Sequence, residues 1–418
     1  MSDPIHLSRR TLLQGLAASA LPVLSTRLLA APSPSAGRSK LLVVFLRGAY
    51  DAANVLVPVS SDFYYQSRPN IAIARPSSGT PEAALPLDTT WGLHPALRDT
   101  LYPLWQKQQL AFVPFAGTDD TSRSHFETQD SIELGQPLGG TRNYQSGFLN
   151  RLVVELGGAR NASGQPGAMA FTDQLPLALR GNLALPNMAL KNVKRAGLDA
   201  QQSSVIAQMY QGRRMAAPVQ EGFAVRDEVA REMSASSPGM ADEMQAANRG
   251  AIAAAGFEGE ARRIARMMRE AYSVGFVDVG GWDTHVNQGG ASGALASRLG
   301  ELGRGLAGYA DEMGPAWRDS VVVVISEFGR TFRENGNRGT DHGHGTAYWV
   351  LGGSVRGGRV LGQQVDLTAA TLFQNRDWPV LNEYRAVFGG LFARLYGLDD
   401  AALGRIFSGV KRQDLGLV

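Results

Sequence analysis

A run of five consecutive β-branched residues, Val321–Ile325, constrains the fold of this chain more than any other feature. Because the run shows no alternation between apolar and polar residues, it predicts a strand that is buried on both faces of a parallel sheet. The strand is followed at once by Ser326 and Glu327, and soon afterwards by the glycine-flanked residues Asp341–His344. Ligands bind beyond the carboxyl ends of strands in open α/β sheets, so these polar residues are expected at a binding edge.

Two further apolar runs end in the same way. Lys40–Leu46 is expected to be the first buried strand, with Asp51 in the loop at its carboxyl end, and Phe276–Val279 runs into Asp283 and His285. Helical patterns separate these runs, and strands that alternate with helices form βαβ units. The sequence therefore predicts an α/β fold, a three-layer αβα sandwich with a mainly parallel sheet.

Other elements follow from local patterns. Further strands are expected over Leu110–Phe115 and Ala347–Leu351, and helices over 91–109, from near Ser122 or Ser124, over Gly259–Tyr272, 295–309 and Glu383–Tyr396. Residues 200–256, which are rich in Gln, Ala, Ser and Met and contain no motif, are expected to form a helical insertion.

The histidines point to one shared polar site. The chain has only six among its 418 residues, and four of them stand in short clusters beside Asp, Glu or Ser: His125, His285, His342 and His344. Scattered histidines would seldom fall in this way, although each cluster by itself would pass for an ordinary polar loop. His94 precedes a proline and is expected to be a structural turn residue.

Carboxylates and imidazoles at one sheet edge are the ligands that a divalent metal needs. With no cysteine in the chain, any metal must use oxygen and nitrogen ligands. Seven residues are predicted as ligands for one or two ions: Asp51, Asp283, His285, Glu327, Asp341, His342 and His344. The imidazoles favour zinc or manganese, while an acid-rich site also tolerates calcium or magnesium.

A nucleophile is expected where the polar loop after Leu110–Phe115 opens a helix. Ser124, or else Ser122 or Thr121, would supply the hydroxyl, with His125 beside it as a further catalytic group. Arg47 and Arg330 border the predicted site and could hold an anionic ester by paired hydrogen bonds. The alternative for these arginines is a salt bridge that neutralises the acids.

The N-terminus is typical of an export signal. Ser8–Leu13 contains a pair of arginines, and a modestly apolar stretch too short to cross a bilayer follows. This pattern predicts a twin-arginine signal peptide and linker over 1–36, a mature domain over 37–418, passage through the twin-arginine translocase and a periplasmic location. Removal of Asp3 and three arginines would lower the formal charge from +3 to +1. Nucleic acid is therefore not an expected partner, and no stable membrane anchor is expected.

Several ordered motifs carry a resemblance to a known family. The chain resembles domain-of-unknown-function family 1501 in five motifs that follow the N-terminal SRRTLL. They are RGAYDAANVLVP, RSHFETQD, GGWDTHVNQ, SEFGRT and GTDHGHG. That family resembles the alkaline phosphatase and sulfatase superfamily. The resemblance implies an alkaline-phosphatase-like fold in which Asp51, Ser124, Asp283 with His285, Glu327, and His342 or His344 take the site positions.

One departure from the superfamily pattern bears on function. Phe328 stands where an Asp-His pair would supply an imidazole, and phenylalanine cannot bind a metal. His125 or Asp341 would have to replace that ligand, or the site would hold a single ion. The sequence thus predicts an exported metal-dependent hydrolase of phosphate or sulfate esters acting on a small anionic substrate. The alternative is a non-catalytic metal-binding exported protein that acts in binding or assembly.

Overall fold

The computed structural model describes residues 39–158, 167–190, 209 and 248–418. The predicted signal peptide and linker, and nearly all of the predicted helical insertion, lie outside these residues. The described end of the predicted insertion contains a short strand, β7 (Ile252–Ala253), which pairs with β8. Within the described residues, no helix is both long enough and apolar enough to cross a bilayer.

The core of the structure is a sheet in the strand order β11-β5-β10-β9-β1-β8-β6, in which β12 also pairs with β5 and β7 with β8. β1 (Lys40–Leu46) runs parallel to both β8 (Val274–Gly280) and β9 (Ser320–Ser326), with Val43 opposite Phe276 and Val323. β10 (Thr346–Gly352) is antiparallel to β9 and to β5 (Leu110–Gly117). The remaining pairings in this sheet are parallel, so the sheet is mainly parallel.

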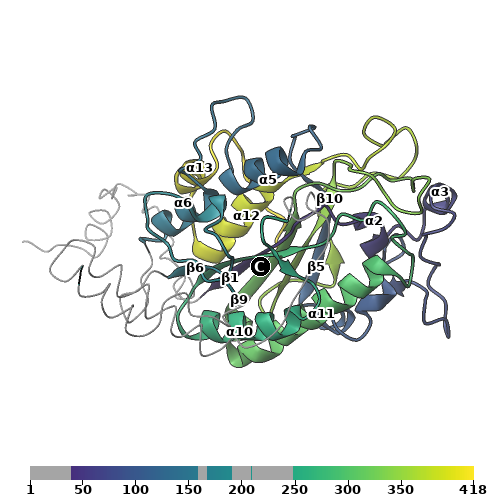
Figure 1. Cartoon of the computed structure of the whole chain (residues 1–418), viewed down its shortest axis with the longest axis horizontal. Helices are drawn as coiled ribbons and strands as arrows, with labels where there is room; N and C mark the ends of the chain where they lie inside the picture. Colours follow the sequence, from purple (N-terminus) through teal and green to yellow (C-terminus); the bar gives the residue numbers. More distant parts are fainter. Residues whose placement is uncertain (1–38, 159–166, 191–208, 210–247) are drawn as a thin grey trace, which may run out of the picture. The chain divides into compact units, whose positions relative to one another are not determined.

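Alternate residues of β1 point into two separate hydrophobic cores. Leu42, Val44 and Leu46 pack in the core beneath α10 (Phe257–Glu270) and α11 (Ala294–Met313). Leu41, Val43 and Phe45 pack in the other core, beneath the helices α6 (Phe148–Glu155), α12 (Tyr384–Tyr396) and α13 (Asp400–Ile406). Figure 1 shows these two helical layers on opposite faces of the sheet. The predicted three-layer αβα sandwich is confirmed.

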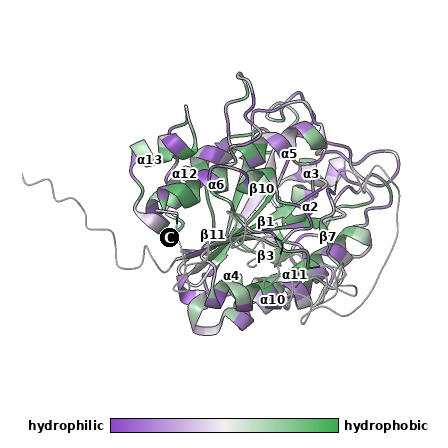
Figure 2. Cartoon of the chain, turned by 60° about the vertical axis from the view of Figure 1, so that its left-hand side comes forward, coloured by the Kyte–Doolittle hydropathy of each residue, from purple (hydrophilic) through white to green (hydrophobic). Residues whose placement is uncertain are grey.

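The distribution of polar residues agrees with these layers. Figure 2 shows the central strands mainly in the hydrophobic colour, whereas hydrophilic residues gather in loops and on parts of the helices. The remaining elements are short: α2 (Ala52–Val55), β2 (Leu56–Val57), α3 (Asp62–Ser67), β3 (Leu85–Pro86), β4 (Gly92–Leu93), η1 (Pro95–Leu97), α4 (Tyr102–Gln106), β6 (Ala168–Ala170), η2 (Leu177–Leu179), η3 (Gly314–Asp319), β11 (Arg359–Val360) and β12 (Asn382–Glu383).

The helix predicted over 91–109 is wrong in its extent. That segment contains β4, the single turn η1 and the short helix α4, which begins at Tyr102. Proline cannot donate the backbone hydrogen bond that a continuing helix needs, and Pro95 and Pro103 each stand in the first turn of a new helical piece. His94 caps η1 by accepting a hydrogen bond from Ala96 N on Nδ1, the structural role predicted for it.

The carboxyl ends of β9, β1 and β8 lie side by side, because these three strands are adjacent and parallel. Gly48, which follows β1, has a φ of 113°, and a Cβ at this position would lie 2.7 Å from the backbone nitrogen of Asp283. Only glycine permits this close approach. Its N–H also donates to Glu327 Oε1 at 2.8 Å, so Gly48 joins the loops that follow the three strands.

Candidate metal centre

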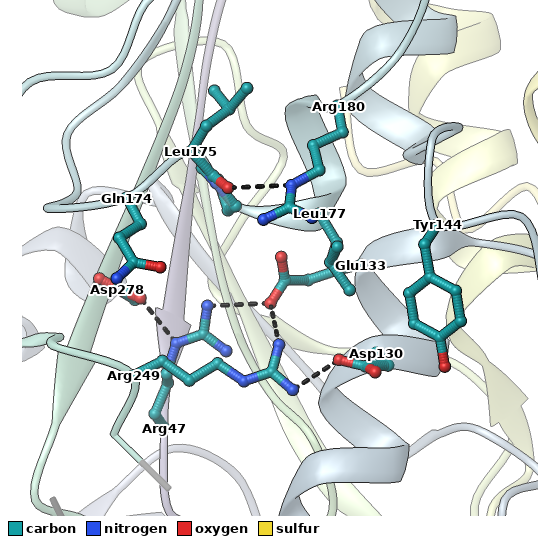
Figure 3. Close-up of a pocket in the computed structure, with 11 residues that line it drawn as sticks. Arg47, Asp130, Glu133, Tyr144, Gln174, Leu175, Leu177, Arg180, Arg249 and Asp278 are labelled. Carbon is teal, nitrogen blue, oxygen red and sulfur yellow. Dashed lines mark hydrogen bonds and ion pairs between the residues drawn. The ribbon is translucent and has the colours of Figure 1, made fainter. Parts of the chain in front are cut away.

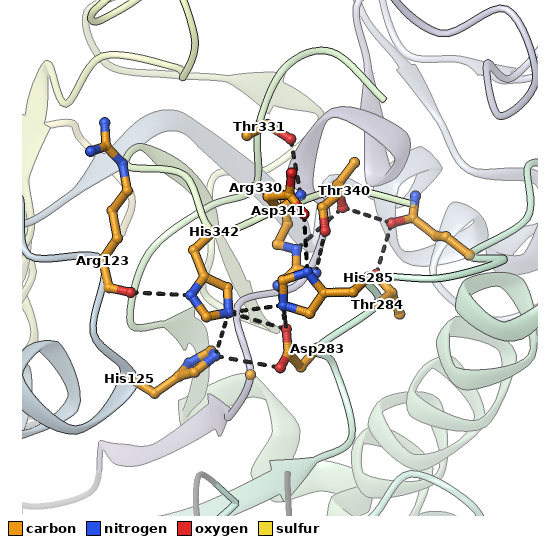
Figure 4. Close-up of polar contacts among 12 residues, drawn as sticks. Arg123, His125, Asp283, Thr284, His285, Arg330, Thr331, Thr340, Asp341 and His342 are labelled. Atoms are coloured by element: carbon orange, nitrogen blue, oxygen red, sulfur yellow. Dashed lines mark hydrogen bonds and ion pairs between the residues drawn. The ribbon is translucent and has the colours of Figure 1, made fainter. Parts of the chain in front are cut away.

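A histidine from a helix start meets an aspartate and a histidine from two loops at this sheet edge. His125 is the first residue of α5 (His125–Leu134), Asp283 follows β8, and His342 lies in the loop between β9 and β10. The potential ligand atoms of these three residues lie within 4.8 Å of one another. The Nε2 atoms of His125 and His342 are 3.0 Å apart, and Asp283 lies 3.7 Å from the first and 3.3 Å from the second. Figure 4 shows all three side chains turned toward a common centre.

His285 adds a further imidazole beside His342 and Asp283. Its Nε2 atom lies 2.8 Å from Asp283 Oδ1 and 3.1 Å from His342 Nε2. Ligands of a tetrahedral zinc, at bond lengths of about 2.0–2.1 Å, are separated by roughly 3.4 Å. His125, Asp283 and His342 form the group whose ligand atoms all lie close together, so these three side chains could hold a divalent cation, with His285 beside them.

The outer nitrogen of each imidazole has a partner that can only accept a hydrogen bond. Nδ1 of His125 lies 2.8 Å from Glu327 Oε1, and Nδ1 of His285 lies 3.2 Å from Asp341 Oδ1. Nδ1 of His342 lies 3.1 Å from the backbone oxygen of Arg123. Carboxylate and carbonyl oxygens require a proton on Nδ1, so a neutral ring turns its Nε2 lone pair toward the centre. Outer partners of this kind orient the histidine ligands of metal sites.

Two of the charged groups titrate far from their ordinary values. Burial of His125 acts to lower its pKa, but its hydrogen bonds with Asp283 and Glu327 outweigh this and raise the pKa to about 9. Burial of Asp283 acts to raise its pKa, but hydrogen bonds from His125, His285 and His342 hold that pKa well below its usual range. A cation bound at this centre would take the place of the proton that His125 otherwise holds.

Glu327 binds His125 from behind and does not point its carboxylate into the group of potential ligands. Its buried carboxylate accepts hydrogen bonds from Gly48 N, Gln129 Nε2 at 3.0 Å and Ser326 Oγ at 2.8 Å, besides the contact with His125. Burial would raise the pKa of Glu327, yet the hydrogen bond and charge of His125, together with the hydrogen bond from Gln129, lower it to about 2. Both carboxylate oxygens are thus engaged, and the structure does not place Glu327 in the ligand group.

Phe328 has a role in positioning. Its ring stacks on the His125 imidazole at a centroid distance of 4.9 Å, and lies 5.3 Å from the His342 ring. Phe328 therefore supports His125 and His342 by packing.

A buried arginine holds Asp283 from the other side. Arg330 Nη1 donates to Asp283 Oδ1 at 2.5 Å, while its Nη2 donates to the backbone oxygen of Thr340. Thr340 in turn donates to Gln288 Oε1 at 3.0 Å, and Gln288 Nε2 donates to Asp51 Oδ2 at 2.6 Å. Arg330 thus binds the acid of the centre, which is the neutralising alternative considered for it.

Three other predicted site residues lie outside the ligand group. Both Asp51 oxygens are engaged by the buried Arg68 guanidinium, at 2.5 and 3.0 Å. Arg47 is buried and pairs with Asp278 and Glu133. His344 is buried against the Phe373 ring at a centroid distance of 4.6 Å, and burial lowers its pKa. A charged partner thus engages Asp51 and Arg47, and an aromatic ring covers His344.

Ser124 is the N-cap of α5 and accepts a weak 3.5 Å hydrogen bond from Glu127 N. The predicted helix start is correct, and the hydroxyl stands one residue before His125. No contact joins it to the other site residues within the described chain. Asp341 belongs to the site as the outer partner of His285, and Asn335 also donates to it at 3.0 Å.

Sequence reasoning missed several residues that complete the site. Gln129 stands four residues after His125 on α5, so the two share one face, and this spacing could have revealed it. Gln288 ends the motif GGWDTHVNQ but received no role, and Arg68 gave no signal because it stands outside the motifs. The backbone oxygen of Arg123 could not be foreseen; Arg123 has a φ of 54°, in the left-handed region.

Comparison with known families identifies the chain. The model of a family described as "Protein of unknown function (DUF1501)" matches residues 38–407. The chain belongs to this family. A search of curated proteins finds no match.

Solved structures give only distant likenesses. One is a protein of the alkaline phosphatase superfamily from Vibrio parahaemolyticus, with 9% identity and a TM-score of 0.38, covering 83% of this chain and 69% of that one. Another is the alkaline phosphatase from the Antarctic bacterium TAB5, with 10% identity and a TM-score of 0.31, covering 75% and 92%. At such TM-scores these likenesses carry no argument about the activity of this DUF1501 chain.

Proposed function

We propose that this DUF1501 protein is an exported metal-dependent hydrolase of phosphate or sulfate esters. One observation carries the proposal: His125, His342 and Asp283 converge, with each imidazole fixed from behind by an acceptor. Imidazole nitrogens combined with one carboxylate favour zinc or manganese over calcium. Such an ion, when bound, acts as a Lewis acid on the oxygen of an ester.

The chain's own residues would prepare this chemistry. Glu327 and Phe328 fix the His125 ring by a hydrogen bond and by stacking. Arg330 fixes the carboxylate of Asp283 and balances its charge. Ser124, one residue from His125, is our proposed nucleophile, and attack by water is the alternative if its hydroxyl serves only as the helix cap.

The decisive experiment measures metal content and activity on the same preparations. We expect close to one zinc or manganese per chain, and hydrolysis of an aryl phosphate or aryl sulfate that chelation abolishes and added metal restores. Asp283→Asn should lose both the metal and the activity. Asp311→Asn, an exposed acid on α11, is the matched control and should retain both. A folded wild-type protein that binds no zinc or manganese would disprove the proposal.

The variant Ser124→Ala then tests whether Ser124 or a water molecule attacks the ester. If Ser124 attacks the ester, the variant keeps its metal and loses activity by several orders of magnitude, as nucleophile removal usually does. Retention of most activity would assign attack to water. Since Ser124 also caps α5, its loss should cost about 0.5–2 kcal/mol of stability, which unfolding measurements can separate from catalysis.

A second candidate function is binding or assembly without turnover. Among the described residues, no hydroxyl contacts His125, His342 or the other two central side chains, which favours this candidate. The ion pair between Asp283 and Arg330 favours it as well. This candidate predicts a metal-loaded protein with no activity on phosphate monoesters, phosphodiesters or sulfate esters. A single partner at equal stoichiometry in a periplasmic pull-down would then support it.

Export is proposed on the N-terminal sequence alone. The paired Arg9 and Arg10 precede a modestly apolar stretch, as twin-arginine signals do. Replacement of both arginines by lysine should retain the protein in the cytoplasm, as read by cell fractionation. Periplasmic recovery of the doubly substituted protein would show that another route is used.

A further inference from the structure

A second polar cavity lies along α5, away from its first residue. It has a volume of about 370 Å³ and is bordered by α5, by the segment 174–180 that contains η2, and by residues at the ends of β1 and β8. Three arginines, three acids and Tyr144 are among the residues that line it. The volume falls at the small end of the range for small-molecule sites. None of the four central side chains of the metal centre lines it.

The acids of the cavity are each paired with an arginine. Arg47 Nε donates to Asp278 at 2.6 Å and its Nη2 to Glu133 at 2.9 Å, while Arg249 donates to Asp130 at 2.5 Å. Figure 3 shows the guanidinium groups of Arg47 and Arg249 meeting at Glu133. Arg47 and Glu133 are each only 1% exposed. Arg47, Glu133 and Asp278 therefore form a buried polar wall, and the partly exposed pair of Arg249 and Asp130 continues it.

Arg180 differs from the other two arginines of the cavity. Its Nε donates to the backbone oxygen of Leu175 at 3.4 Å, and within the described residues its two Nη nitrogens have no hydrogen-bond or ion-pair partner. Considering only the described parts of the chain, the cavity thus contains unpaired donors on Arg180. Three arginines and three acids line it, so its formal charge is nevertheless balanced.

This charge balance limits the ligand. A small anion or cation would leave one uncompensated charge in a partly desolvated site, which is costly. A neutral ligand rich in hydroxyl groups avoids that cost, because each hydroxyl both donates and accepts. Tyr144, which is 43% exposed, offers a ring face to the apolar side of such a ligand, and Leu175 and Leu177 add apolar surface.

We propose that this cavity binds a neutral saccharide unit. The inference rests on the cavity and its charges, and is independent of metal binding and of hydrolysis at the other site. Arg180 supplies the hydrogen bonds that select hydroxyl groups, and Tyr144 supplies the stacking surface.

The test is a titration of the full-length mature protein with defined sugars, read by calorimetry or by saturation-transfer NMR. The neutral probes are glucose, galactose and N-acetylglucosamine. Glucuronate, glucosamine and glycine are the anionic, cationic and zwitterionic comparators. We expect at least one neutral sugar to bind with a Kd below about 10 mM, a range open to weak small ligands, and more tightly than all three comparators.

Matched variants assign binding to the cavity. Arg180→Ala and Tyr144→Ala should each weaken the best sugar by about tenfold or more, as loss of a hydrogen-bonding or stacking group does. Arg318→Ala, at an exposed arginine outside the cavity, should leave affinity unchanged. His342→Ala, which removes a proposed metal ligand, should also leave it unchanged, so this test is separate from that of the hydrolase.

Three results would overturn the proposal. The first is a Kd above about 10 mM for every neutral sugar. The second is a lower Kd for glucuronate, glucosamine or glycine than for the best neutral sugar. The third is the same Kd for that sugar in wild type, Arg180→Ala and Tyr144→Ala.

Discussion

Asp51 and Asp283 occupy equivalent places in the fold and have different surroundings. Each follows one of two adjacent parallel strands, β1 and β8, and each is paired with a buried arginine, Arg68 or Arg330. Asp51 is enclosed, and its remaining contact is an amide donor from Gln288. The Asp283 side chain is 15% exposed and lies among imidazoles. Of the two acids, only Asp283 has imidazole neighbours with which it could share a metal ion.

The largest effect is expected from separating Asp51 and Arg68. Arg68→Met would leave the Asp51 carboxylate buried without its cation, which should cost about 3–5 kcal/mol of unfolding free energy. Urea denaturation of the metal-free protein measures this. The double variant Asp51→Leu with Arg68→Met should recover much of the loss, because neither charge remains buried. A loss under about 1 kcal/mol, the range of exposed pairs, would contradict the comparison.

Substitution within the ligand group should act on metal affinity instead. His342→Ala removes a central imidazole and should weaken zinc binding by more than the roughly 10–100-fold typical of changes to outer partners. Competition with a fluorescent chelator measures the affinity. Asp51→Asn is the counterpart variant and should keep its affinity within about tenfold of wild type. A greater loss in Asp51→Asn than in His342→Ala would reverse the assignment.

Removal of the outer partner of His125 should have an intermediate effect. Glu327→Gln keeps the size of the side chain but weakens its hold on the His125 Nδ1 proton, and should reduce zinc affinity by roughly 10–100-fold. Glu301→Gln, at a surface acid of α11, serves as the control. An unchanged affinity in Glu327→Gln would mean that stacking on Phe328 alone is sufficient to orient the imidazole.

The smallest effect concerns pH and His94. Burial lowers the pKa of His94 from its ordinary 6.5 to about 4. The unfolded chain therefore takes up the proton first, so the contribution to stability is complete above pH 6.5 and is lost as pH falls toward 4. Between pH 6.5 and 4, the free energy of unfolding should fall by up to about 1.4 kcal/mol per pH unit. His94→Asn, whose amide oxygen can still cap η1, should remove that part of the pH dependence, as measured by urea denaturation at several pH values. The same dependence of unfolding free energy on pH in wild type and variant would contradict this prediction.

Much of the fold could be predicted because it depends on local pattern. The bounds of β1 are those of the predicted run, and the predicted core of β9 lies within the observed strand. Ser124 caps α5 as the loop composition indicated. The helix predicted over 91–109 was wrong because Pro95 and Pro103 each begin a new helical piece within it.

The site was predictable only in part. His125, Asp283, His285 and His342 were all singled out, although His125 was assigned mainly to catalysis and was considered as a ligand only in place of the imidazole missing at Phe328. Asp51, Glu327 and His344 have the right chemistry for ligands, yet each is engaged elsewhere by a partner distant in the chain. Such partners follow from three-dimensional packing, which local pattern does not encode.

By itself, the sequence determined where the buried strands end, and therefore which edge of the sheet collects the acids and histidines. That information is local, since apolar runs and glycine breaks specify strands and their ends. Tertiary structure decided which of those groups face one another. A buried carboxylate needs a partner, and whether it meets Arg68 or an imidazole depends on loops that pack together only in the folded chain. For this DUF1501 protein, that choice separates the structural acid Asp51 from the proposed ligand Asp283.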